Sequence, residues 1–181
     1  DHHGLYEQSV RIPFVIRPPD GAKTGVCDGF AQITDVVPTV AAYVDIEKPQ
    51  TVDGHSLRPT IESGDPPDRT AVVAEEAHAQ RRRMIRTPNK KLIYHLEGDR
   101  TCRYCELVHE PDRELYDLKR DPAETENCAS RRPERSNELQ EEAERRVAEL
   151  TADEPAMTTD GTGDYDDEEE IMDRLKALGY R

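Results

Sequence analysis

DHHGLYEQSVRIPFVIR, residues 1–17, decides how the rest of the sequence is interpreted. Two histidines, His2 and His3, precede an apolar run from Ile12 to Ile16 that is typical of a buried strand in a parallel sheet. In open α/β sheets, functional side chains gather in loops at strand ends, so the histidines are candidates for a site. A sheet does not begin with a single internal strand, and we therefore expect a further part of the protein before residue 1.

The composition is strongly acidic. Asp and Glu number 39 against 25 Lys and Arg in 181 residues, which gives a net charge of −14. This balance argues against binding to DNA, RNA or anionic lipid, because those partners need basic patches. Excess carboxylate suits a protein that stays hydrated in high salt, so we expect a halophilic source. The alternative is that acidic tails alone produce the excess.

The sequence gives little information on location and assembly. No apolar run approaches the roughly 20 residues needed to span a bilayer, and no signal peptide is visible. The cellular location is left open, with the cytoplasm slightly favoured, and the oligomeric state is unknown. The four cysteines are too few and too scattered for a disulfide framework.

Apolar periodicity and turn residues predict an order of elements with two parts. The first part holds a strand over residues 11–17, a helix from Thr34 or Asp35 to about Asp45, and a loop-rich stretch over 46–69. The second part holds four strands joined by short turns, which favours antiparallel pairing, and a helix over 133–150 packed against them. The strands are expected at 70–74, 82–87, 91–96 and 114–118. An acidic linker over 151–167 and a last helix over 168–178 complete the chain.

Six short motifs occur in order along nearly the whole chain. They are YEQSVRIP (6–13), TDVVPTV (34–40), DGHSLRP (53–59), RTPNKKLIY (86–94), the signature ELYDL…DPAETEN (114–118 and 121–127) and LKALGY (175–180). Each motif alone is weak, but in this shared order they resemble the motifs of the sulfatases of the alkaline phosphatase superfamily.

The resemblance implies the fold class and the division of the chain. Residues 1–64 would be the C-terminal end of an alkaline-phosphatase-like α/β domain. Residues 65–150 would be a small α+β domain with a four-stranded antiparallel sheet, and residues 151–181 would be an acidic linker and terminal helix. The implied function is sulfuric ester hydrolysis on a sulfate ester substrate.

The resemblance also implies cofactors that this sequence does not hold by itself. The nucleophile of these enzymes is a formylglycine made from the Cys or Ser of Cys/Ser-x-Pro-x-Arg, and no Cys or Ser of this chain begins that motif. The early Asp pair that binds the divalent cation, expected to be calcium, is absent as well. We therefore expect both groups upstream, and no hydrolase activity from this chain alone.

His2 is the principal candidate for the chemistry, as a catalytic and substrate-binding residue, and His3 is a second substrate-binding candidate. In many sulfatases a lysine four residues before the Tyr-Glu pair contacts the sulfate, and His2 stands at that place before Tyr6. A histidine there could donate a hydrogen bond to sulfate or protonate the leaving oxygen. Loop histidines that only pack are the alternative. A metal role for Asp1 is disfavoured, because the metal pair of the family lies well upstream.

Other charged side chains are candidates for structural or substrate-binding roles. Glu7 and Arg11 are expected to pair as a scaffold for the histidine loop. The basic run 81–83 and His78 are candidates for meeting an anionic substrate, although such a run is more often a solvated strand edge.

Cys102 and Cys105 form a CxxC pair in a predicted hairpin. Zinc needs four ligands, which His95, His109 or Cys128 could complete. No second CxxC exists, so two thiols in a variable loop are the simpler interpretation.

Two alternatives to the sulfatase function stay open. Phosphodiesterases and phosphonate monoester hydrolases share the superfamily architecture, so the ester could be phosphorus-based. The other alternative is a non-catalytic acidic binding protein, which the missing nucleophile favours and the ordered motifs disfavour.

Overall fold

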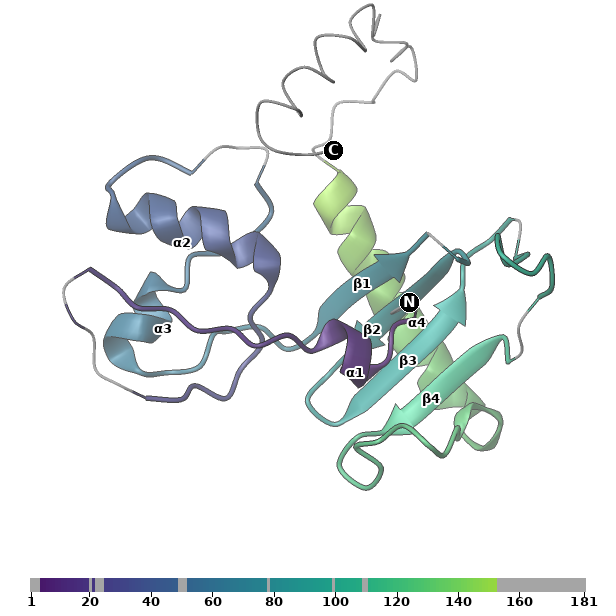
Figure 1. The fold of residues 1–181 in the computed structure, drawn as a ribbon. Coiled ribbons are helices and arrows are strands. Elements are labelled where there is room, and N and C mark those ends of the chain that lie inside the picture. The colour runs from purple at the N-terminus through teal and green to yellow at the C-terminus, as the bar shows by residue number, and fades with distance from the viewer. Residues whose placement is uncertain are drawn as a thin grey trace, which may run out of the picture.

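A four-stranded antiparallel sheet organises the second part of the chain. The computed structural model describes residues 4–19, 21, 25–48, 52–77, 79–98, 100–108 and 111–152. The strands lie in the order β1-β2-β3-β4, each antiparallel to its neighbour (Figure 1). The predicted sheet is therefore confirmed, with strand ends shifted by one or two residues. The strands are β1 (Val72–Glu76), β2 (Arg82–Arg86), β3 (Lys90–His95) and β4 (Arg113–Asp117).

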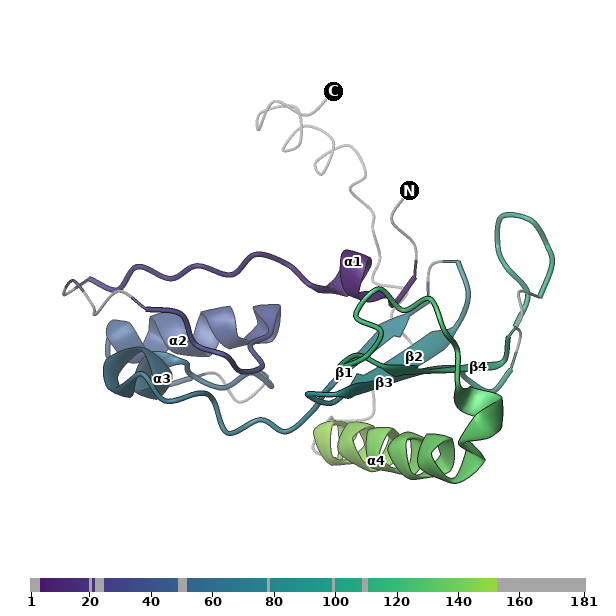
Figure 2. The same cartoon turned by 90° about the horizontal axis from the view of Figure 1, so that it is seen from below.

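The long helix α4 (Pro133–Thr151) covers one face of the sheet, as predicted (Figure 2). Successive strand residues point to opposite faces, and Ile85, Leu92 and Leu115 point toward α4. They pack with Leu139 and Ala143 of the helix, and all five side chains are fully buried. This cluster is the larger of the two cores.

The opposite face of the sheet is covered by the N-terminal segment. Leu5 is buried there against Met84, Ile93 and Tyr116, and the short helix α1 (Glu7–Val10) follows directly. The second core thus joins residues 79 to 111 positions apart in sequence, and Figure 2 shows the sheet lying between α1 and α4.

The first part of the chain forms a separate helical layer beside the sheet (Figure 1). It contains a 3₁₀ turn (Ile33–Asp35) that leads into α2 (Val36–Tyr43) and a further helix, α3 (Arg58–Ser63). The start of α2 agrees with the prediction. The helix α3 was missed in the loop-rich stretch, where a proline at its beginning is compatible with a first helical turn.

The predicted strand over residues 11–17 is wrong for the described part of the chain. There, residues 12–18 run without any backbone hydrogen bond, and Ile12 and Val15 are 52% and 91% exposed. Apolar patterning reports that a segment suits burial, but a strand also needs a neighbour with free backbone groups. None of the described elements offers one to this segment.

Two further expectations concern other parts of the chain. None of the helices in the described ranges is long and apolar enough to cross a bilayer. The predicted last helix, over 168–178, lies outside the described residues. The domain boundary near residue 65 stays a prediction, and it falls in the link between α3 and β1.

Candidate functional site

The residues that directly follow the two candidate histidines are fixed to the sheet by two buried groups of charged and phenolic side chains. The first group is the tyrosine anchor, defined as Tyr6, Arg82, Glu114 and Tyr116. The second is the lysine anchor, defined as Glu7, Arg86, Lys91 and Glu124. Each anchor joins the N-terminal segment to the C-terminal sheet.

In the tyrosine anchor, one buried carboxylate collects three donors. Glu114 on β4 is 3% exposed and accepts a hydrogen bond of 2.7 Å from the hydroxyl of Tyr6. The hydroxyl of Tyr116 and the guanidinium of Arg82 donate to the same carboxylate. The rings of Tyr6 and Tyr116 also meet edge to face, with centroids 6.3 Å apart. A buried carboxylate with this many partners is satisfied, so it holds Tyr6 in one place.

In the lysine anchor, the fully buried Lys91 lies between two carboxylates. Its Nζ is 3.1 Å from Oε1 of Glu7 and 2.9 Å from Oε1 of Glu124. Glu124 also accepts a 2.6 Å hydrogen bond from the backbone N–H of Glu7. Arg86 approaches Glu7 at 3.3 Å and stacks on the ring of Phe30 at 5.0 Å. The first turn of α1 is thereby fixed in both side chain and backbone.

The pKa values of four anchor side chains are shifted: two carboxylates, Glu114 and Glu7, and two phenols, Tyr6 and Tyr116. Burial alone would raise the pKa of Glu114, but the bonds from Arg82, Tyr116 and Tyr6 outweigh it and lower that pKa. The same balance, with Lys91 and Arg86 as donors, lowers the pKa of Glu7. Burial and the neighbouring Glu114 raise the pKa of both tyrosines. The phenols therefore stay protonated donors and the carboxylates stay ionised acceptors, which is the chemistry of a scaffold.

The predicted site residues precede this scaffold in the sequence. His2 and His3, and also Asp1, lie outside the described residues, so their roles stay predictions. The first residue that the structure describes is Gly4, which precedes the buried Leu5. The predicted pairing of Glu7 with Arg11 is replaced by pairing with Lys91 and Arg86. The scaffold role expected of Glu7 is nevertheless what these contacts provide.

A third polar cluster, the Asp35 hub, fixes α2 to the loop over 53–57. Asp35 is fully buried and accepts two hydrogen bonds from Arg69, at 2.6 and 2.8 Å. It also accepts the backbone N–H groups of Gln32 and His55, at 2.8 and 2.9 Å. Burial raises its pKa, but Arg69 and these backbone donors outweigh that and lower it. Gly54 is required here, because a Cβ would lie 1.9 Å from the carbonyl oxygen of Thr34.

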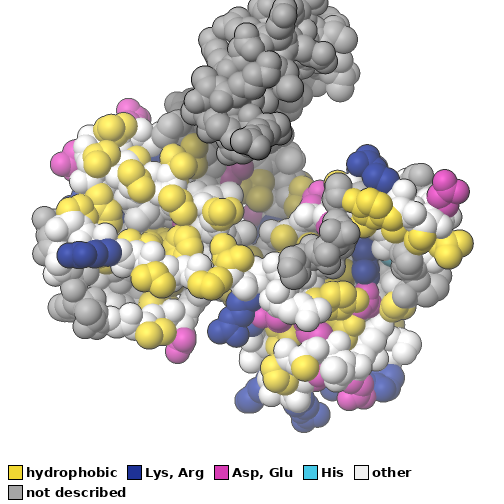
Figure 3. Space-filling model, viewed as in Figure 1, with side chains coloured by type: hydrophobic (Ala, Val, Ile, Leu, Met, Phe, Trp, Pro, Cys, Tyr) yellow, Lys and Arg dark blue, Asp and Glu magenta, His cyan; other side chains and the backbone are white. Residues whose placement is uncertain are grey.

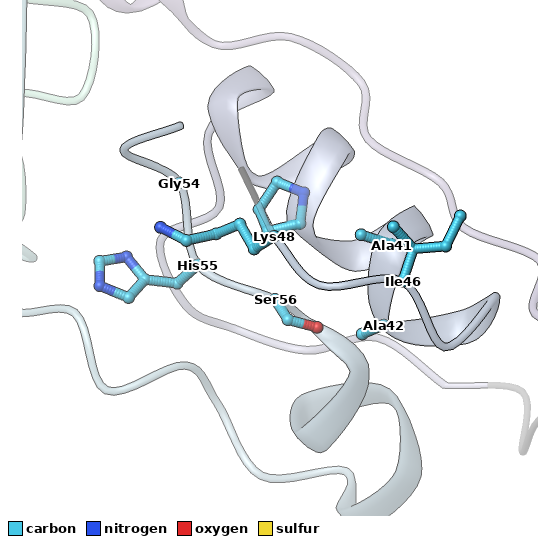
Figure 4. Close-up of a pocket in the computed structure, with 8 residues that line it drawn as sticks. Ala41, Ala42, Ile46, Lys48, Gly54, His55 and Ser56 are labelled. Carbon is cyan, nitrogen blue, oxygen red and sulfur yellow. The ribbon is translucent and has the colours of Figure 1, made fainter. Parts of the chain in front are cut away.

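A shallow hollow of about 280 Å³ opens beside this hub (Figure 4). Ala41, Ala42 and Ile46 line it, with Lys48 and His55 among its polar residues. The amine of Lys48 is already bonded to the carbonyl of Val52. The hollow thus lacks the convergent polar groups of a specific ligand site.

Two members of the basic run at residues 81–83, Arg82 and Arg83, form internal ion pairs, whereas Arg81 is exposed. Arg82 points to Glu114, while Arg83 points to the other face of the sheet and pairs with Glu75 and Glu144. Both arginines are less than 10% exposed. The expected roles in meeting substrate or as a solvated edge are therefore wrong for these two residues. His78 lies outside the described residues.

The cysteines show no ligand cluster in the described part of the chain. The described residues contain no group of three or more His, Cys, Asp or Glu side chains that could hold a metal. Cys128 is buried, and its thiol contacts the carbonyl of Leu115 at 3.1 Å, while Cys102 is buried and Cys105 is exposed. A zinc site completed by Cys128 is not formed, and His109 lies outside the described residues.

These anchors join the same motifs whose order pointed to sulfatases. The family described as N-sulphoglucosamine sulphohydrolase, C-terminal, matches residues 1–153. The chain belongs to this sulfatase family.

Two curated relatives of the chain are bacterial sulfatases. It is 30% identical over 137 residues to the Delta 4,5-hexuronate-2-O-sulfatase of Bacteroides thetaiotaomicron, covering 71% of this chain and 26% of that protein. It is 29% identical over 138 residues to the N-acetylglucosamine-6-O-sulfatase of the same organism, covering 70% and 23%. The chain therefore spans about a quarter of the length of these relatives.

A solved structure supports the fold. The chain is 25% identical to an enzyme crystallised with its substrate D-glucosamine-2-N,6-O-disulfate, with a TM-score of 0.52 over 68% of this chain and 25% of that chain. The expected fold class and family are thus confirmed. Membership of this family implies a divalent metal and a formylglycine in the full-length enzyme. The described residues do not fit either group, because they contain neither a metal cluster nor the Cys/Ser-x-Pro-x-Arg motif.

Proposed function

We propose that this chain is the C-terminal part of a sulfatase, a sulfuric ester hydrolase, and that it holds His2 and His3 at the substrate sulfate. The observation that carries the proposal is the family match over residues 1–153, in which the anchored segment directly follows the two histidines. His2 would bind sulfate and protonate the leaving oxygen, and His3 would bind sulfate beside it. The formylglycine and a divalent cation, calcium, would be supplied by a part of the enzyme other than these 181 residues.

The relatives support a sulfated sugar as the substrate class. Two of them are named for sulfate on hexuronate and on N-acetylglucosamine, and the solved relative holds a disulfated glucosamine. The chain carries a net charge of −14, which repels an anionic sulfated sugar. Binding of such a substrate therefore requires cationic side chains gathered at the site. The acidity itself we attribute to a halophilic source, and the cytoplasm is the location we propose.

A phosphorus ester is the second candidate substrate. The observation that favours it is a 29% identity over 142 residues to the multifunctional alkaline phosphatase superfamily protein PehA of Trinickia caryophylli. The third candidate, a non-catalytic acidic binding protein, is favoured only by the missing nucleophile motif.

The test is a paired assay of the native protein purified from its source. We expect faster hydrolysis of an aryl sulfate than of an aryl phosphodiester, and a faster phosphodiester rate would refute the sulfatase assignment. In the same protein, His2→Gln should lower kcat/KM for the sulfate ester about 100-fold. The matched control is His55→Gln, which changes an exposed histidine beside the hollow and is expected to be neutral. An unchanged rate in His2→Gln would refute the role of His2.

A further inference from the structure

The loop between β3 and β4 carries two cysteines, Cys102 and Cys105, in one tight turn. The carbonyl of Cys102 accepts a 2.9 Å hydrogen bond from the N–H of Glu106, and the N–H of Cys102 donates a 2.9 Å bond to the carbonyl of Leu107. The first of these bonds closes a single helical turn that does not continue into a helix. Glu106 has a left-handed backbone, with a φ of 59°, which ends the turn. The backbone that carries both cysteines is therefore fixed by its own hydrogen bonds.

The turn places Cys102 and Cys105 within reach of each other. A helix has a Cα radius of about 2.3 Å and a rise of about 1.5 Å per residue, so Cα atoms three residues apart are separated by about 5 Å. A disulfide needs Cα atoms about 4.4–6.8 Å apart. Side chains at this spacing also lie on the same face of a helical turn. The folded backbone is therefore compatible with a bond between the two sulfur atoms.

The two thiols differ in their access to solvent. Cys105 is exposed, whereas Cys102 is only 6% exposed. The neighbouring Tyr104 and Leu107 are 57% and 64% exposed, and Figure 3 shows hydrophobic side chains at the surface where this loop lies, at the right of the view. A small molecule in solution therefore reaches the Cys105 thiol, while the Cys102 thiol is shielded.

The turn is tied to the neighbouring β1–β2 loop. The N–H of Arg103 donates a 2.9 Å hydrogen bond to the carbonyl of Ala79. The side-chain amide of the buried Gln80 donates to the carbonyl of Arg100 at 3.4 Å. Gln80 stands two residues before Arg82 of the tyrosine anchor. A covalent bond across the turn should therefore slow the opening of this contact between the two loops.

We propose that Cys102 and Cys105 form a reversible disulfide bond by exchange with a small-molecule disulfide such as oxidised glutathione. The sulfur of Cys105 attacks one sulfur of that disulfide, and the glutathione that leaves takes up the proton of the Cys105 thiol. The sulfur of Cys102 then attacks the Cys105 sulfur and releases the second glutathione, which takes up the proton of Cys102. Two protein thiols are oxidised, and one disulfide is reduced to two thiols. The new bond closes a short ring, so it adds little stability through chain entropy, which suits reversible exchange.

Peptide mapping of the native protein tests the proposal. The protein is incubated with an excess of oxidised glutathione, alkylated, and digested with trypsin, which cleaves after Arg103 and so separates the two cysteines. We expect residues 101–103 linked by a disulfide to residues 104–113, in about 10-fold or greater excess over a sample kept in reduced glutathione. Transfer to reduced glutathione should remove the link. Cys27, which is also exposed, is the internal control and should carry one glutathione without forming a link.

Two variants of the native protein separate the roles of the cysteines. In Cys102→Ser, exchange should stop with one glutathione on Cys105, because no second thiol releases it. Cys128→Ser changes another buried cysteine and should still form the linked peptides. A pair that stays unmodified in oxidised glutathione would overturn the proposal. So would a glutathione that stays on Cys105 of the unchanged protein, or a link from Cys105 to Cys27.

Hydrogen exchange of the same samples tests the contact between the two loops. Formation of the disulfide should slow exchange at the amide of Arg103 by about 10-fold, since this N–H bonds to Ala79 and lies inside the closed ring. Amides of β4 should exchange equally in both forms and serve as the reference. Equal exchange at Arg103 in the oxidised and reduced protein would refute the expected tightening of this contact.

Discussion

Removing the positive charge of Lys91 should destabilise the chain more than any other single lysine change we can design. Its side chain is fully buried, and its Nζ lies 3.1 and 2.9 Å from the carboxylates of Glu7 and Glu124. In Lys91→Met, Glu124 is left 4% exposed without its cation, and Glu7 keeps only Arg86 at 3.3 Å. Breaking a buried ion pair from one side costs about 3–5 kcal/mol.

The retained Arg86 contact places the expected loss near 3 kcal/mol, at the lower end of that range. With a urea slope of about 1–3 kcal/mol per molar, the midpoint of unfolding should fall by about 1–3 M. The matched control is Lys90→Met on the same strand. Its partner Asp117 is 19% exposed and keeps Arg132 at 4.0 Å, so the loss should be much smaller than in Lys91→Met.

Urea unfolding of the 181-residue chain, followed by circular dichroism, measures both losses. Combining Lys91→Met with Glu7→Gln and Glu124→Gln should recover much of the loss, because no unpaired charge then stays buried. Equal midpoints for Lys91→Met and Lys90→Met would refute the lysine anchor. A triple variant as unstable as Lys91→Met would show that the loss comes from packing and not from charge.

Three other changes test the anchors and the hub. Gly54→Ala should lower the free energy of unfolding by about 1–3 kcal/mol, because its Cβ would lie 1.9 Å from a backbone atom. Gly25→Ala has open space around its Cβ and should be neutral in the same urea titration. Tyr6→Phe should lower the free energy of unfolding by about 1.5–3 kcal/mol, because it removes a hydrogen bond to a buried carboxylate. The hydroxyl of Tyr43 has no partner among the described residues, so Tyr43→Phe should lower the stability much less when both are measured by thermal melting. Because the pKa values of Asp35, Glu7 and Glu114 are lowered on folding, the stabilisation from these carboxylates is present above the ordinary values of 3.8 and 4.5 and is lost as pH falls below them. Asp35→Asn should flatten that acid loss in an unfolding series from pH 6 to pH 2, and an unchanged slope would contradict the role of the hub.

The sheet and its covering helix could be predicted because their patterns are local. Alternating apolar residues and short turns give the strands, and the 19 residues of α4 repeat their apolar positions at helical spacing. The same local reasoning failed for residues 11–17, since whether an apolar stretch pairs depends on a neighbouring strand that periodicity cannot report.

The anchors could not be predicted from the sequence for a different reason. Tyr6 and Glu114 are 108 residues apart in sequence, and Glu7 and Lys91 are 84 apart. Pairing by sequence distance favoured Arg11 for Glu7, but the fold brings Lys91 closer. One signal was present: a lysine inside the apolar strand KKLIYH is unusual, and a buried lysine requires carboxylate partners. The ordered motifs that contain these residues indicated the family, but they did not indicate that the motifs contact one another.

The measurement that tests the central claim most directly is the intact mass of the native protein from its source, together with its rate of sulfate release from an aryl sulfate. We predict a mass well above 20.6 kDa and measurable sulfate release. A mass near 20.6 kDa with no sulfate release would contradict it and would favour a non-catalytic acidic binding protein.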